Sequence, residues 1–480
     1  MPEPDEVQLS EDEFPLPFGI DADSGKPIPS HFPGRPDLDA AAVVEFGQPG
    51  AADHLAIPDI DPNQLKDAGW GVVYAEGTPQ EVKDALAPLL EHRKAEAGDL
   101  FRVFEGAKGL REGELPDAWV ERNGSSFRMV DPKDGVPLYL LLVGDPTRIP
   151  FEFQYLLDLH WSAGRLEFDT AKEYAAYAEK VVAYEKLEAA QLPTRKTATL
   201  FCTKNPGDRA TGLLHNQAVK PMLEGSASVR KLDGVKDFRV RGVLAGEAQK
   251  QRLLRLLRGE EAGGRPAFLF TGSHGIRVKD NEARAREENG ALLCQDWPGF
   301  GPTQPEHLLR AEDVTSSLDL SGMIHYLFAC YGAGCPALDN FDRGSDGKPP
   351  RLLQQPIVSR LAQRMLRQGA LAVLGHVDRA WTYSFQSGKG RPQVQDIRSV
   401  IVRLFQGDRL GKAMEEFNTQ WATLAALMQE KEAQAAAGFG TLSPQALANL
   451  MVARNDARNY IILGDPAVRL RADELTAADG

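Results

Sequence analysis

The stretch "AFLFTGSHGI", from Ala267 to Ile276, is an apolar run that stops on small residues around a histidine, His274. A second run of the same kind, "IHYLFACYGAGC", begins at Ile324 and reaches a cysteine, Cys330, where its apolar residues end. Short apolar runs closed by glycine are typical of strands buried on both faces of a parallel sheet. Because parallel strands point the same way, the sequence predicts that His274 and Cys330 meet at the carboxyl edge of the sheet, where open α/β sheets place their sites.

Strands and helices alternate on both sides of this pair. Apolar strands are expected at 197–203 and 371–377, with amphipathic helices at 249–259 and 356–370. The last ninety residues are expected to be mainly helical, ending in the strand of "NYIILGDPAVRL". This alternation predicts an α/β fold with a mostly parallel sheet flanked by helices.

The chain divides into three parts on the same grounds. Its first residues are rich in Pro, Gly, Asp and Ala without a sustained period, and a second βα series opens near Pro193. We therefore expect an extended N-terminal arm (1–55), a smaller N-terminal α/β subdomain (56–193) and a larger subdomain with a helical C-terminal part (194–480).

Composition excludes several classes of protein. The 480 residues carry 55 Lys plus Arg against 68 Asp plus Glu, a formal net charge of −13, which argues against binding to nucleic acid or to an anionic membrane. No run approaches the roughly 18 to 20 apolar residues of a membrane span, and the acidic start lacks the features of a secretory signal. The 4 cysteines are too few and scattered for a disulfide framework. We expect an intracellular, cytoplasmic protein.

A cysteine beside a histidine indicates nucleophilic catalysis. A thiol with a pKa of about 8.5 is a slow nucleophile near neutral pH until an imidazole takes its proton. The small residues around both side chains let backbone approach a substrate carbonyl. We expect the N–H groups of Gly275 and Cys330 to bind the oxyanion of an acyl-transfer reaction. The chemistry needs no cofactor and no metal.

From about residue 65 to 470 the sequence resembles the gingipain-like branch, peptidase family C25, of the caspase-like clan (clan CD) of cysteine peptidases. The resemblance rests on pieces in the same order, namely "YLLLVGDPTRIPF", "GRLEFDTAKEYAAYAEKVVAYE", "FTGSHG", "FACYGAGC", "GALAVLGHVDRAWTYSF" and "NYIILGDPAVRL". It implies a caspase-hemoglobinase-like fold, with Cys330 as nucleophile and His274 as general base or imidazolium partner.

The resemblance also suggests how a substrate would bind. It implies that "GHVDRAWTYSF" helps to build the S1 pocket, with Trp381 as a wall and Asp378 or Arg379 setting the charge preference. Gingipains that cleave after arginine use an acidic residue early in the helix after "GR", where this chain has Asp169 and Glu173. The resemblance therefore favours Arg or Lys at P1. A helix cap at Asp169 and a solvated helix face at Glu173 are the alternatives.

A third catalytic residue is harder to place. The family pattern suggests an acidic residue before "GR", where Asp158 is nearest although the register points closer to His160. A Cys–His dyad without a third residue is the alternative.

The sequence thus predicts a cysteine endopeptidase acting on a protein or peptide, controlled by an activating or inhibiting protein partner or by a proteolytic cut. Self-cleavage is a further hypothesis for the polar stretches 277–290 and 339–351, which carry Arg and Lys. The main alternative is a catalytically silent caspase-like scaffold or signalling adaptor. A zinc site built from His274, His325, Cys330 and Cys335, and with it a metal-dependent hydrolase, is only weakly indicated by the ligand spacing.

Overall fold

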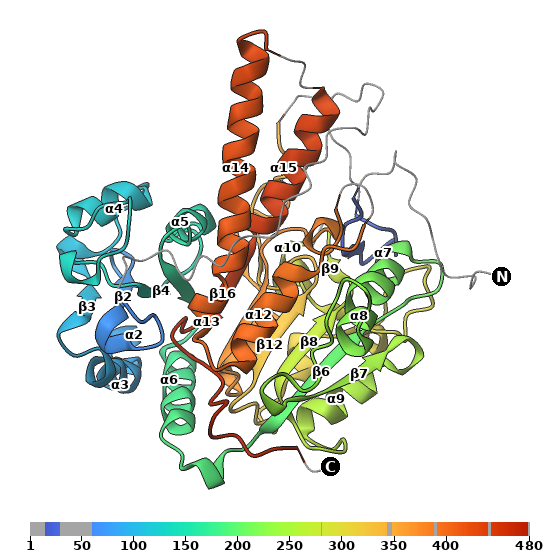
Figure 1. Cartoon of the computed structure of the whole chain (residues 1–480), viewed down its shortest axis with the longest axis horizontal. Helices are drawn as coiled ribbons and strands as arrows, with labels where there is room; N and C mark the ends of the chain where they lie inside the picture. The colour runs from blue at the N-terminus through green and yellow to red at the C-terminus, as the bar shows by residue number, and fades with distance from the viewer. Residues whose placement is uncertain are drawn as a thin grey trace.

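The computed structural model describes residues 15–28, 60–279, 281–342, 348–387, 391–439 and 443–478. Within these residues, ten strands form one sheet in the order β3-β2-β4-β5-β16-β15-β12-β8-β6-β7. Every neighbouring pair in this sheet is parallel except β15 with β16. The mostly parallel sheet flanked by helices that the sequence predicts is therefore confirmed (Figure 1).

The strands of the large sheet are short and mostly buried on both faces, as the continuous apolar runs predict. Their bounds are β2 (Trp70–Tyr74), β3 (Phe101–Phe104), β4 (Tyr139–Val143), β5 (Ser162–Leu166), β6 (Arg195–Cys202), β7 (Arg239–Leu244), β8 (Pro266–Gly272), β12 (Ile324–Phe328), β15 (Ala372–His376) and β16 (Tyr460–Gly464). Two smaller sheets consist of β1 (Gly19–Asp21), β9 (Gly275–Arg277), β10 (Leu292–Leu293) and β11 (Leu308–Leu309), and of β13 (Gly334–Cys335) and β14 (Ile357–Val358).

Helices lie on both faces of the large sheet. On one face Met365 of α11 contacts His325, and on the other Phe417 of α14 packs against the ring of Tyr326, because neighbouring residues of β12 point to opposite sides. The helices are α1 (Leu65–Ala68), α2 (Gln80–Ala85), α3 (Ala87–Ala97), α4 (Pro116–Arg122), α5 (Phe151–Leu157), α6 (Ala171–Glu185), α7 (Arg209–Leu213), α8 (Lys220–Glu224), α9 (Lys250–Arg258), α10 (Glu282–Glu288), α11 (Arg360–Arg367), α12 (Gln395–Phe405), α13 (Leu410–Ala413), α14 (Glu415–Ala436) and α15 (Pro444–Arg458).

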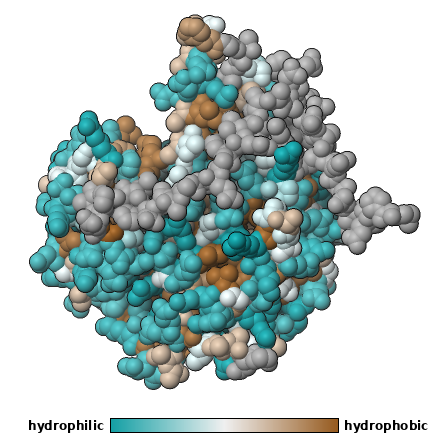
Figure 2. Space-filling view, in the orientation of Figure 1, coloured by the Kyte–Doolittle hydropathy of each residue, from teal (hydrophilic) through white to brown (hydrophobic). Residues whose placement is uncertain are grey.

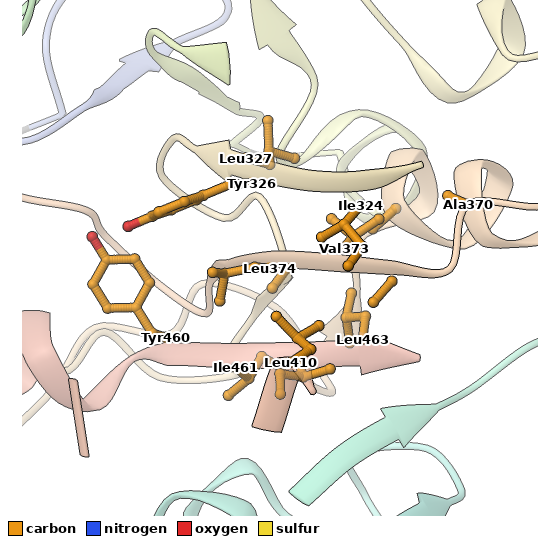
Figure 3. Close-up of a cluster of buried hydrophobic side chains, with 14 of the residues drawn as sticks. Ile324, Tyr326, Leu327, Ala370, Val373, Leu374, Leu410, Tyr460, Ile461 and Leu463 are labelled. Atoms are coloured by element: carbon orange, nitrogen blue, oxygen red, sulfur yellow. The ribbon is translucent and has the colours of Figure 1, made fainter. Parts of the chain in front are cut away.

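The C-terminal strand β16 joins the two predicted subdomains. It lies between β5 of the N-terminal half and β15 of the second half, so the two subdomains share one sheet. Figure 3 shows the buried cluster at this junction, in which Tyr326, Leu374 and Tyr460 come from three neighbouring strands and Leu410 comes from α13. Each fully buried side chain of this size contributes about 1.5 to 3 kcal/mol to stability, so the cluster holds β16 against β15 and β12, while its pairing with β5 reaches the N-terminal half. The predicted boundaries at 55 and 193 remain predictions.

One face of the molecule is mainly polar. The face in Figure 2 is largely hydrophilic, with apolar residues in small groups, and α14 and α15 project from the body as a pair (Figure 1). Among the described helices we find none whose length and hydropathy would suit a membrane span.

The predicted N-terminal arm (1–55) is described only at residues 15–28, and its remaining residues lie outside the described part of the chain. Within 15–28, β1 pairs in parallel with β9, which directly follows His274. In Figure 1, β1 lies beside β9 and α7, on the side of the molecule away from β2 and β4. The start of the chain therefore reaches the edge of the sheet where the predicted catalytic residues lie.

Candidate active site

The pairing of β8 with β12 brings His274 and Cys330 to one edge of the sheet. The last paired residues are Gly272 and Phe328, and both chains continue in the same direction beyond them. Ser273 donates its N–H to the carbonyl of Phe328 at 3.2 Å, which keeps the two chains together past the strand ends. The juxtaposition expected from the two apolar runs is therefore present.

A glycine after the histidine makes this approach feasible. A Cβ atom at Gly275 would lie 1.8 Å from the carbonyl oxygen of Cys330. Any side chain there would force the two loops apart. The small residues of "TGSHG" thus serve close backbone packing against the cysteine.

Cys330 is fully buried in a polar backbone setting. Its Sγ accepts the N–H of Ala380 at 3.3 Å and lies 3.6 Å from the carbonyl oxygen of the same residue. Burial raises the pKa of the Cys330 thiol well above its usual range, although the Ala380 N–H and the charge of Arg379 act in the opposite direction. Burial thus favours the protonated thiol at Cys330.

The residue after the cysteine holds an unusual backbone conformation. Tyr331 has a φ of 60° and donates its N–H at 2.7 Å to the carbonyl of Asp378, which itself has a φ of 73°. Left-handed conformations at residues other than glycine cost of order 1 to 3 kcal/mol and cluster at functional sites. The two turns support each other behind the thiol.

The structure supplies a carboxylate partner for His274 that the sequence reasoning missed. Asp208 accepts a hydrogen bond from Nε2 of His274 at 2.7 Å, and it also caps the N-terminus of α7 through the N–H groups of Ala210 and Thr211. Burial acts to raise the pKa of Asp208, but the charge of His274 and the hydrogen bonds from His274 and Thr211 outweigh it and lower the pKa. Asp208 is therefore ionised near neutral pH.

With Nε2 donating to Asp208, the other ring nitrogen of His274 is the proton acceptor. His274 Nδ1 is buried and has no hydrogen-bond partner among the described residues. This nitrogen is thus available to take a proton from a neighbouring thiol.

The two predicted oxyanion donors converge on one atom. The N–H of Gly275 and the N–H of Cys330 each donate to the carbonyl oxygen of Phe18, both at 2.9 Å. Two backbone N–H groups on one carbonyl beside a thiol and a histidine form the donor set that acyl transfer requires.

The model of one protein family, Peptidase family C25, matches residues 78–471. The chain belongs to peptidase family C25. It is a cysteine-type peptidase, as the resemblance predicted. A search of curated proteins by sequence found no match.

A solved structure shares the fold of this C25 peptidase. The Arg-specific cysteine proteinase gingipain R (RgpB) has a TM-score of 0.51 and 12% identity over 85% of this chain and 79% of its own. A structure titled "Structure of Protease" has a TM-score of 0.47 and 14% identity over 84% of this chain and 78% of its own. The complex of pro- and mature domains of RgpB from Porphyromonas gingivalis has a TM-score of 0.48 and 11% identity over 84% and 80%. At these identities the likeness concerns the fold.

The two carboxylates predicted to read a basic P1 side chain pair with arginines of α11 in this C25 peptidase. Asp169 lies 2.6 Å from Arg360, and Glu173 lies 2.9 Å from Arg367. Glu173 also completes a capping box with Thr170 at the start of α6. Their observed contacts are those of helix ends and helix packing.

Asp378 is buried, and its carboxylate is hydrogen-bonded to neighbouring loop residues. Its carboxylate accepts the side-chain amide of Asn340 at 3.0 Å and the N–H of Arg379 at 2.9 Å. Burial and the charge of Asp339 raise the pKa of Asp378 to about 7, against the opposing charge of Arg379. Arg379 in turn forms an ion pair with Asp339.

Trp381 contacts the N-terminal segment through its backbone. Its ring is fully buried and packs against Phe341 at 5.2 Å, while its backbone pairs with Pro17 in an antiparallel bridge. The backbone of "GHVDRAWTYSF" thus contacts Sγ of Cys330 and residues 16–18, and an S1 pocket with Trp381 as a wall remains a prediction.

The remaining candidates have structural contacts. Asp158 accepts the N–H of Ala163 at 2.8 Å, and the partner of His274 is Asp208 instead. Nε2 of His325 is 2.8 Å from Oγ1 of Thr271, and burial lowers the pKa of His325 to about 3, as fits a packed histidine.

The other cysteines, Cys202, Cys294 and Cys335, are buried free thiols. Among the described residues, the one group of three possible metal ligands whose ligand atoms lie within 4.8 Å of one another is His92, Glu96 and Glu185. The four residues of the weak zinc hypothesis therefore do not form such a group. Arg93 donates to Glu185 at 2.6 Å within that group and occupies its carboxylate.

Proposed function

We propose that this C25 peptidase is an endopeptidase in which Cys330 is the nucleophile, His274 the base and Asp208 the residue that positions His274. The observation that carries the proposal is the convergence of the Gly275 and Cys330 N–H groups on one carbonyl oxygen beside the thiol. A substrate carbonyl placed there is polarised by both donors.

The steps follow from the contacts. His274 Nδ1 takes the thiol proton, and Sγ of Cys330 attacks the carbonyl carbon to give a tetrahedral oxyanion held by the two N–H groups. The C–N bond then breaks, the imidazolium gives its proton to the leaving amine, and a thioester remains. Water, deprotonated by His274, hydrolyses the thioester and restores the thiol. Asp208 stabilises the imidazolium in both half-reactions.

Three finer expectations concern the P1 preference, the location and the regulation of the peptidase. A preference for Arg or Lys at P1 was predicted from Asp169 and Glu173, and the ion pairs of both with α11 leave it without support from those carboxylates. Work inside the cell, and control by a protein partner or by a cut, remain predictions.

A peptide-reporter panel tests the proposal. Purified wild type, Cys330→Ala and the matched control Cys335→Ala are incubated with peptides carrying Phe, Tyr, Leu, Arg, Lys or Asp at P1, with and without a chelator. We expect wild type and Cys335→Ala to cleave slowly, because the Cys330 thiol is buried, and we expect this cleavage to be insensitive to chelator and lost in Cys330→Ala. Cleavage that survives Cys330→Ala would contradict the mechanism, and cleavage that the chelator abolishes would favour a metal-dependent hydrolase.

A further inference from the structure

The N-terminal segment "PLPFGID" (residues 15–21) crosses the site as an extended chain. On one side the N–H of Phe18 donates to the carbonyl of Ala380 at 2.8 Å, and the N–H of Thr382 donates to the carbonyl of Leu16 at 3.2 Å. On the other side, β1 pairs in parallel with β9, Gly19 opposite Gly275. The segment therefore has backbone partners before and after the Phe18–Gly19 bond.

That bond lies where a scissile bond would lie. The carbonyl oxygen of Phe18 is the atom that accepts both oxyanion donors, at 2.9 Å each. A Cβ atom at Gly19 would be 3.0 Å from Sγ of Cys330, so the backbone of Gly19 passes directly over the nucleophile. Phe18 thus takes the position of a P1 residue and Gly19 that of P1′.

The side chain of Phe18 occupies an aromatic pocket. It is fully buried and meets Phe328 edge-on at 4.8 Å between ring centroids. Phe385 and His274 each lie 5.8 Å away. Aromatic contacts of this kind stabilise a ring beyond the effect of the area they bury.

A cationic side chain would bind less favourably in the position of Phe18. Burying a charge is unfavourable unless a counter-charge lies beside it. Asp169 and Glu173 are paired with arginines, and the carboxylate of Asp378 is engaged by Asn340 and the Arg379 N–H. The pocket around Phe18 therefore favours an aromatic ring over a guanidinium.

We propose that the S1 pocket of this peptidase selects an aromatic residue, and that residues 15–28 hold the enzyme latent by binding in its cleft as a substrate with Phe18 at P1. This inference rests on the proposed function, and it adds the substrate class and the means of control. The burial of Cys330 and the raised pKa of its thiol agree with a covered nucleophile.

The primed side explains how a substrate-like segment inhibits. If Cys330 attacks Phe18, the Phe18–Gly19 C–N bond breaks, the Gly19 amine takes the proton from His274 and a thioester forms. The amine would stay in place, because β1 pairs with β9 and the chain turns back so that Ile28 donates its N–H to the Gly19 carbonyl at 3.0 Å. A retained amine can attack the thioester and restore the peptide bond, so turnover is slow.

Thiol alkylation tests the position of the segment without requiring catalysis. Cys330 is alkylated with iodoacetamide, followed by peptide mapping, in full-length wild type and in Phe18→Arg, Phe18→Tyr and Phe439→Arg; Phe439 is 77% exposed after α14 and serves as the matched control. We expect Phe18→Arg to react at least about tenfold faster than wild type, since uncovering a thiol restores its reactivity, while the Tyr variant and the control react like wild type. Equal rates in wild type and Phe18→Arg, with both folded by circular dichroism, would overturn the proposal.

Reporter cleavage by the Phe18→Arg variant tests the pocket. We expect kcat/KM for Phe and Tyr at P1 to exceed that for Arg and Lys by at least about tenfold, in line with the cost of burying an unpaired charge. A free peptide of residues 15–28 should inhibit this cleavage, and the same peptide with Arg in place of Phe18 should not. Cysteine-dependent cleavage after Arg or Lys alone would overturn the inference and leave the proposed function standing. If no reporter is cut although alkylation is relieved, the proposed function fails while the position of the segment is supported.

Discussion

Among the described residues, two buried histidines, His274 and His376, each pair with an aspartate in the same half of the molecule, and only His274 adjoins the proposed nucleophile. Nε2 of His274 is 2.7 Å from Asp208, and Nε2 of His376 is 3.1 Å from Asp456. In both histidines Nδ1 is buried without a hydrogen-bond partner among the described residues. The carboxylate partner and the burial of the imidazole therefore do not distinguish His274 from His376.

Their surroundings differ. His376 is enclosed by rings, with Tyr460 at 3.8 Å and Phe328 at 5.6 Å between centroids. His274 stands at a strand end next to Gly275, whose backbone packs on Cys330. A carboxylate-bound imidazole thus becomes a candidate base only where small residues bring it to a nucleophile, and elsewhere it is part of the core.

Replacing each histidine by glutamine should give the largest difference in activity between the two pairs. In the Phe18→Arg background, we expect His274→Gln to lower kcat/KM by about 10²- to 10⁴-fold, the usual contribution of a general base. His376→Gln should mainly reduce the free energy of unfolding, by about 1 to 3 kcal/mol, because Asp456 loses a buried hydrogen-bond donor. Reporter kinetics and urea unfolding on both variants measure this. Similar losses of activity at unchanged stability would show that His376 also takes part in catalysis.

The glycines beside the two histidines offer a second, smaller test. Alanine at 275 would place Cβ 1.8 Å from the Cys330 carbonyl oxygen, whereas alanine at 375 would meet its nearest neighbour, the Ala333 nitrogen, at 3.2 Å. A displacement of about 1 Å at a catalytic group costs on the order of 10²-fold in rate. We expect a loss of that size for Gly275→Ala and a much smaller one for Gly375→Ala, measured as kcat/KM. Equal losses would mean that the close approach at Gly275 has no special role.

The pH dependence of stability gives the smallest effect. The pKa of Asp208 is lowered in the folded state, so its contribution is present above the unfolded pKa of about 3.9 and is lost as the pH falls through the lower folded value. Asp208→Asn should therefore be less stable than wild type at pH 7, with the difference shrinking below about pH 4. Urea unfolding of both proteins from pH 7 to pH 3 checks this. A difference that stays constant down to pH 3 would show that the carboxylate charge is not its source.

Several strands were predictable because their apolar runs are long and are closed by glycine. The strands expected at 197–203 and 371–377 are β6 (Arg195–Cys202) and β15 (Ala372–His376). The short and half-exposed strands β3 and β7 carry no such run and were missed. Local patterns thus locate buried strands better than edge strands, whose formation depends on the neighbour they pair with.

The role of Asp208 as partner of His274 could not be predicted from local sequence patterns. In the sequence it is an ordinary helix-capping aspartate in "NPGDRATG", and it performs that role. It meets His274 because β6 pairs with β8, Cys202 opposite Gly272, which places the loops after both strands at one edge. The position of its loop after a predicted strand of the same sheet was the one signal that pointed to it.

The sequence by itself determined the buried strands with long apolar runs, the family and the meeting of His274 with Cys330, because strand ends and small residues are local features and parallel strands share an edge. Only the tertiary structure decided that Asp208 holds the imidazole, that Asp169 and Glu173 bind arginines, and that Phe18 lies on the two oxyanion donors. Those contacts join residues far apart in the chain, and such contacts depend on how the sheet and its loops pack rather than on any pattern of neighbouring residues.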